Sequence, residues 1–212
     1  MTPYRFLLAG LAAIAPIPLS AHETLPAGIW TNTEDEYFAE EEGREKPKWV
    51  GYEVSEDGKW RSIDAFRKAQ SDWNRGRIPG LSERGESGWQ VDNSELRKAR
   101  DFFCWVSVRR FANKADGSPD WSFVRNLPNF DQGGRVLVPG EGTAPDVTIR
   151  MRNVTWARGS RNKPSLVLYI HKEDPVRAES YSWASPDSRM VGVNLRWAQA
   201  SCSRALSQAE AP

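Results

Sequence analysis

The sequence predicts an all-β protein: an antiparallel β-sandwich or barrel with short loops and at most one or two helical turns. Nine or ten short segments rich in β-branched and aromatic residues follow one another, with glycine, proline and aspartate turns at close spacing. No long helical periodicity interrupts them. The 212 residues include 10 Trp, 5 Tyr and 8 Phe, which is far more than a disordered chain carries. Because no fixed-period repeat or linker is visible, residues 22–212 are expected to form a single β-rich domain.

The first 21 residues read as a secretory signal peptide. Arg5 precedes an apolar run over residues 6–15, prolines end that run, and Ser20-Ala21 offers a cleavage site. An apolar run of about ten residues is too short to cross a bilayer of about 30 Å. An uncleaved anchor is the alternative. Because no later segment is long and apolar enough to span a membrane, we expect a secreted or periplasmic protein.

The first half of the mature chain offers one clear hairpin. Residues 34–42 hold six carboxylates, which is typical of a solvated face or a short helix. Residues 49–54 and 59–63 flank Asp57-Gly58, a pair that accepts the positive φ of a hairpin turn. Residues 64–87 are expected to be a long loop, and residues 94–101 either one or two helical turns or the start of a strand.

The second half is more strongly β-prone. Residues 147–152 alternate as a half-buried strand does, and residues 102–111 form a second hairpin with residues 121–124. The remaining expected strands are 135–138, 165–172, 181–183 and 190–197.

Cys104 and Cys202 are the only cysteines. In an oxidising compartment an isolated pair most simply forms one disulfide, which would tie the Cys104 strand to the C-terminal strand. Two free buried thiols are the alternative. The two cysteines and two distant histidines lack metal-ligand spacing, so no metal site and no cofactor is expected.

The charge balance excludes one class of partner. Lys and Arg number 29 against 28 Asp and Glu, a formal net charge of +1. Nucleic-acid binding needs a basic excess to displace counterions from phosphates, so no nucleic-acid partner is expected.

Strand alternation suggests a candidate binding face. Val147, Ile149 and Met151 share one side of their strand, so Arg150 and Arg152 share the other. If the strands at 102–111, 147–152 and 165–172 lie in one sheet, a polar face carries Trp105, Arg109, Arg150, Arg152, Tyr169 and His171. Arginines beside aromatic rings bind carboxylates, phosphates or polar sugars. An ordinary solvent face is the alternative.

The leading functional hypothesis is therefore a non-enzymatic, exported binding module for a sugar or a small polar or anionic ligand. Most of the ten tryptophans are expected in the core, with two or three free to line a site. The Gly28-Ile29-Trp30 segment also resembles the Gly-x-Trp start of lipocalin-like barrels, a resemblance of three residues.

A glycan-active enzyme is the first alternative. No Gly-x-Ser-x-Gly motif supports a serine hydrolase, but 28 acidic residues leave room for a carboxylate pair. If cleavage follows Ala21, a terminal His22 with His171 looks like the copper brace of lytic polysaccharide monooxygenases, and that resemblance implies copper-dependent oxidation. A structural or envelope-interaction protein is the third hypothesis.

Overall fold

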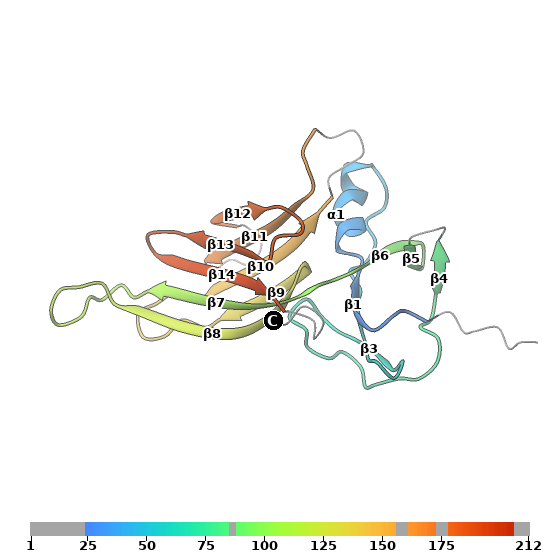
Figure 1. The fold of residues 1–212 in the computed structure, drawn as a ribbon, viewed down its shortest axis with the longest axis horizontal. Helices are drawn as coiled ribbons and strands as arrows, with labels where there is room; N and C mark the ends of the chain where they lie inside the picture. The colour runs from blue at the N-terminus through green and yellow to red at the C-terminus, as the bar shows by residue number, and fades with distance from the viewer. Residues whose placement is uncertain (1–23, 85–87, 156–160, 173–177, 206–212) are drawn as a thin grey trace, which may run out of the picture.

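The computed structural model describes residues 24–84, 88–155, 161–172 and 178–205. Their regular secondary structure consists of fourteen strands and one short helix, which confirms the predicted all-β class. The strands form three antiparallel sheets, and in Figure 1 the sheet from the first half of the chain stands beside two sheets from the second half. The predicted signal peptide and its cleavage site lie outside the described residues.

The first half of the chain builds a six-stranded sheet in the order β3-β2-β1-β6-β5-β4. Its strands are β1 (Gly28–Thr31), β2 (Gly51–Val54), β3 (Trp60–Ser62), β4 (Leu81–Arg84), β5 (Gly88–Val91) and β6 (Ser94–Lys98). The predicted hairpin is confirmed, because β2 pairs with β3 across a turn in which Gly58 has φ +75°. A small apolar core packs against this sheet and comprises Leu25, Trp30, Val54, Ile78, Leu81, Val91 and Leu96.

The second half forms two four-stranded sheets, in the orders β12-β11-β10-β9 and β13-β14-β7-β8. Their strands are β7 (Asp101–Arg109), β8 (Trp121–Phe130), β9 (Gln132–Val138), β10 (Val147–Val154), β11 (Ser165–Lys172), β12 (Ser180–Ala184), β13 (Met190–Asn194) and β14 (Ala198–Arg204). One apolar core lies between the two sheets, including Val106, Ile149, Leu168 and Ala200. The two sheets therefore pack as a curled sandwich in which β8 runs into β9 through the single residue Asp131.

The acidic segment at 34–42 forms helix α1 (Thr33–Glu41). Three carboxylates in its first turn complement the positive end of the helix dipole. Gly43, with φ +67°, ends the helix in the left-handed conformation, and the Arg44 N–H donates to the Ala39 carbonyl at 2.8 Å. The helix has about two and a half turns, slightly more than expected, because α1 packs against the sandwich instead of standing in solvent.

A buried junction at Asp131 joins the two halves. The Asp131 carboxylate accepts from the Arg100 backbone N–H and from Arg100 Nε, each at 2.7 Å. Thr31 and Thr33 both donate their hydroxyls to the Gln132 carbonyl at 2.9 Å. Gly133 has φ +85°, and a Cβ there would lie 2.4 Å from Thr33 Oγ1, so the close approach requires glycine. These contacts hold together β1, the start of α1, the segment that leads into β7, and the start of β9.

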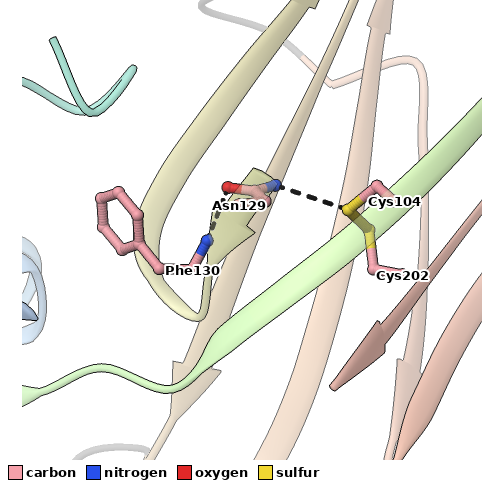
Figure 2. The surroundings of a disulfide bond; sticks show 4 residues. All are labelled: Cys104, Asn129, Phe130 and Cys202. Atoms are coloured by element: carbon pink, nitrogen blue, oxygen red, sulfur yellow. Dashed lines mark hydrogen bonds between the residues drawn. A yellow bond between two sulfur atoms is a disulfide. The ribbon is translucent and has the colours of Figure 1, made fainter. Parts of the chain in front are cut away.

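The predicted disulfide joins Cys104 on β7 to Cys202 on β14, residues that face each other across the strand pair. Both side chains are buried in the sandwich core. Figure 2 shows Asn129 beside this bond: its amide contacts Cys104 Sγ at 3.9 Å, while its Oδ1 accepts the Phe130 N–H at 2.9 Å. The disulfide therefore sits close to the β8–β9 junction.

Two segments differ from expectation, and at 94–101 the structure follows the strand alternative. The predicted loop at 64–87 ends in β4, and the ambiguous segment at 94–101 contains β6 and the start of β7. The predicted strand at 190–197 is shorter than expected: β13 ends at Asn194, and residues 195–197 turn the chain into β14. The Leu195 N–H donates to the Ala198 carbonyl, which closes that tight turn.

Removing the disulfide should lower stability substantially. The bond closes a loop of 98 residues, for which chain-entropy reasoning gives about 4–5 kcal/mol before strain is subtracted. We expect the Cys104→Ala/Cys202→Ala variant to unfold at markedly lower urea concentration than the oxidised wild type. Equal midpoints, or two reactive thiols in the denatured, unreduced wild type, would contradict the assignment.

Asp131→Ala should cost about 3 kcal/mol, because it removes the buried carboxylate that accepts the Arg100 backbone N–H and Nε. Burial raises the pKa of Asp131, and the Arg100 hydrogen bonds oppose that rise. Asp116→Ala is the control, since that carboxylate bonds only its own exposed turn at Ser118 and should change stability by less than about 0.5 kcal/mol. Equal effects of the two variants in urea unfolding would refute the junction's role.

Candidate functional site

The outer face of the β12-β11-β10-β9 sheet carries an ordered set of polar and aromatic side chains. Register places Arg135 opposite Arg150, Arg150 opposite Tyr169, and Tyr169 opposite Tyr181. These four residues, one from each strand, form a row that we call the arginine–tyrosine row. In the next row Arg152, Val167 and Trp183 are neighbours. The face therefore combines guanidinium groups on β9 and β10 with rings on β11 and β12.

Four of the six predicted site residues share this face. Arg150 and Arg152 on β10 lie on the same side as Tyr169 and His171 on β11, as alternation predicted. Trp105 and Arg109 do not join them, because β7 belongs to the other sheet of the sandwich. The premise of one shared sheet is thus wrong for β7: alternation assigns a side chain to a face but says nothing of which strands pair.

Trp105 and Arg109 lie on the outer face of the β13-β14-β7-β8 sheet. The Trp105 ring is 5.6 Å from that of Phe123, and the Arg125 guanidinium lies 4.8 Å from the Phe123 ring. Arg109 donates to Asn113 Oδ1 at 3.5 Å. These residues form a second, separate aromatic and basic surface on the opposite side of the core.

Arg152 is buried beneath helix α1. Its Nε and one terminal nitrogen donate to Glu34 Oε1 at 3.0 and 2.9 Å, and the Tyr37 ring lies 3.9 Å from its guanidinium carbon. Side-chain exposure is 4% for Arg152 and 1% for Glu34. Its geometry makes Arg152 the anchor of α1 to the sheet.

His171 is also buried, with 1% exposure, opposite Thr148 on β10. This burial gives the copper-brace resemblance no support, because such a ligand must face an open site. The other member of that resemblance, His22, lies outside the described residues. Within the described chain, no three His, Cys, Asp or Glu residues cluster as metal ligands.

Beyond the half-buried Arg150 and Tyr169, the rings of Tyr181 and Trp183 form the exposed part of the face. The Arg150 guanidinium stacks on Tyr169 at 4.5 Å from the ring centre, and the Tyr169 and Tyr181 rings are 6.0 Å apart. Tyr181 is 63% and Trp183 69% exposed. We call Tyr169, Tyr181 and Trp183 the aromatic platform.

A hollow of about 580 Å³ opens over the platform. Its described lining comprises Arg161, Asn162, Lys163, Ser165, Val167, Tyr169, Tyr181 and Trp183. Sequence reasoning missed Tyr181, Trp183 and Arg135 as site residues. Tyr181 and Trp183 did carry a signal, since two aromatics in alternation on a short predicted strand must point to the same face.

A larger hollow, about 870 Å³, lies between α1 and the β5–β6 hairpin. Its charged side chains already have partners: Arg44 binds Asp35 and Glu42, and Arg97 binds Glu95. By volume this hollow is the stronger candidate for a ligand site, whereas by the chemistry of the side chains the aromatic platform is. The aromatic platform is the better candidate site, because side chains already held in ion pairs offer a ligand less than exposed rings do.

Comparison of the chain with known protein families, curated proteins and solved structures found no match. Functional inference therefore rests on the geometry of this chain. The described helical segment is neither long nor apolar enough to cross a membrane.

Truncating one partner of the Glu34–Arg152 pair should be costly. Arg152→Met leaves the Glu34 carboxylate buried without its cation, and we expect a loss of about 3–5 kcal/mol in urea unfolding. The double variant Glu34→Leu/Arg152→Met removes both charges and should recover much of that loss. A single-variant cost below about 1 kcal/mol would show that α1 is not anchored here.

Proposed function

We propose that this protein is an exported, non-enzymatic binding module whose ligand, a sugar or a small polar or anionic molecule, stacks on the aromatic platform. The observation that carries the proposal is the exposure of Trp183 and Tyr181, beside Tyr169, over a hollow of about 580 Å³. Large rings exposed together on a soluble surface mark interaction sites. Among the nine described tryptophans, only Trp183 and Trp73 are classed as exposed.

The hollow suits an amphipathic ligand. Three rings supply flat apolar surfaces, while Asn162, Lys163 and Ser165 supply polar groups at its rim. Pockets of this volume that combine aromatic walls with a few polar groups are typical small-ligand sites. A sugar presents the matching combination of an apolar ring face and hydroxyl edges.

Binding fits this hollow better than hydrolysis does. Carboxylate-based glycosidases place two acidic side chains across the scissile bond. The described residues that line the hollow include no Asp or Glu. The function of this surface is therefore better explained by holding a ligand than by cleaving one.

Export is supported by two observations of different kinds. The first 21 residues have the pattern of a signal peptide. Cys104 and Cys202 form a disulfide, and structural disulfides persist mainly in oxidising compartments such as the periplasm or the extracellular space.

Fluorescence titration of the mature protein tests the binding proposal. The panel comprises neutral oligosaccharides, oligouronates and inorganic phosphate. We expect one of the sugar classes to change tryptophan emission saturably, and Trp183→Ala to weaken that binding about tenfold or more, because a central ring in an interface carries much of its energy.

Trp73→Ala is the matched control. Trp73 is 43% exposed but lies in the segment between β3 and β4, where Arg61 stacks on it at 4.6 Å. This variant should bind as the wild type does. The proposal fails if no ligand of the panel binds, or if Trp183→Ala binds with wild-type affinity while its circular dichroism stays native.

A further inference from the structure

The arginine–tyrosine row contains a guanidinium whose charge is not compensated. Arg150 makes no salt bridge with any carboxylate of the described residues, and its buried Nε has no hydrogen-bond partner among them. The other buried or half-buried arginines nearby are bonded differently. Arg152 has Glu34, and Arg100 has Asp131. Arg150 instead lies over the Tyr169 ring, with its guanidinium carbon 4.5 Å from the ring centre.

Two other arginines stand near Arg150, of which Arg152 is already paired with Glu34. Arg135 lies opposite it on β9, and Arg152 stands two residues along β10 on the same face. Burial lowers the pKa of Arg150, and the nearby Arg135 and Arg152 charges lower it further. Like charges gathered at a half-buried position are unfavourable unless an anion joins them. Arg150 is thus a half-buried cation with no carboxylate partner among the described residues, and a negative group in the ligand would compensate its charge.

We propose that the ligand of the aromatic platform is an acidic oligosaccharide, with its anionic group on Arg150 and its rings on Tyr181 and Trp183. This inference rests on the proposed function and names the ligand class of the same site. Arg150 on β10 and Tyr181 on β12 are two strand spacings apart, about 10 Å. A chain of two or more sugar rings covers that distance, whereas a free phosphate or acetate ion reaches only one end.

Guanidinium suits this role. It offers planar, paired N–H donors that match a carboxylate or sulfate, and these charge-assisted bonds are stronger than neutral ones. The Tyr169 ring lies 4.5 Å from the guanidinium carbon, a cation–π contact that helps to position the group. An acid group on a sugar would therefore meet a positioned cation beside the rings that hold the sugar.

Calorimetric titration of the wild type with matched ligands tests the charge requirement. Oligogalacturonate carries carboxylates, its methyl ester has the same rings without the charge, and a sulfated oligosaccharide separates carboxylate from sulfate. We expect an acidic oligosaccharide to bind about tenfold or more tightly than the methyl ester, with an affinity that falls as salt rises. Equal affinity for the acid and its ester overturns the inference.

Variants then locate the charge. Arg150→Gln should lose the preference for the acidic ligand and keep the affinity for the methyl ester. Arg109→Gln, which changes an arginine on the outer face of the other sheet, should leave both affinities unchanged. An unaltered acid preference in Arg150→Gln refutes the assignment. Arg150→Lys, which keeps the charge but loses the paired donors, serves if the glutamine variant does not fold, and should show an intermediate preference.

The two proposals fail in different ways. If the neutral ester binds as tightly as the acid and its binding still requires Trp183, the proposed binding function is supported and the acidic ligand class is refuted. If neither ligand binds the wild type, both proposals fall. An acid preference that survives Arg150→Gln but disappears in Arg109→Gln moves the anion site to the opposite face and also overturns this inference.

Discussion

The buried ion pair between Glu34 and Arg152 determines how the two halves of this molecule meet. It joins residues 118 positions apart in the chain, and both side chains are almost fully enclosed. Burying two charges is expensive, so the pair is stable only because Arg152 gives two hydrogen bonds to one carboxylate and lies against the Tyr37 ring. Next to this pair, Phe38 packs against Val154 and Val167, and this apolar contact also holds α1 against the sheet. The helix therefore covers one end of the β10–β11 face and leaves the β12 side open.

This placement gives neighbouring residues opposite roles. Arg150 and Arg152 point to the same face and are indistinguishable by alternation, yet only Arg152 lies under Glu34. His171 shares the face with Tyr169 but is buried, whereas Tyr169 reaches the hollow. The distinction between a structural and a binding arginine depends on a contact from the other half of the chain.

What the sequence predicted follows from local geometry. Side-chain alternation, the Asp57-Gly58 hairpin and the isolated cysteine pair were sufficient for the fold class, the faces of β7, β10 and β11, and the disulfide. Strands β4 and β5 were missed, and β6 was left undecided between helix and strand, because these strands are short and polar. Their turn did carry a signal: Asp92 and Asn93, both at positive φ, form the two-residue hairpin connection that such residues favour. Which sheet β7 joins, and what covers Arg152, are long-range properties that no local pattern contains.

The choice of residues on the outer face argues for selection beyond stability. Thr148 and Val167 show that the same face accepts neutral side chains of moderate size. Arg150 adds nothing evident to the stability of the sheet, since burial and the nearby Arg135 and Arg152 charges disfavour its charged form. Rings exposed on β12, an edge strand of its sheet, likewise reduce solubility without adding to the core. Departures from local optimality that gather in one place are typical of functional sites, where a ligand completes the missing interactions. In this molecule the uncompensated cation Arg150 shares a row with Tyr181, and Trp183 lies in the next row, so a single ligand with both an acid group and a ring would contact both kinds of group.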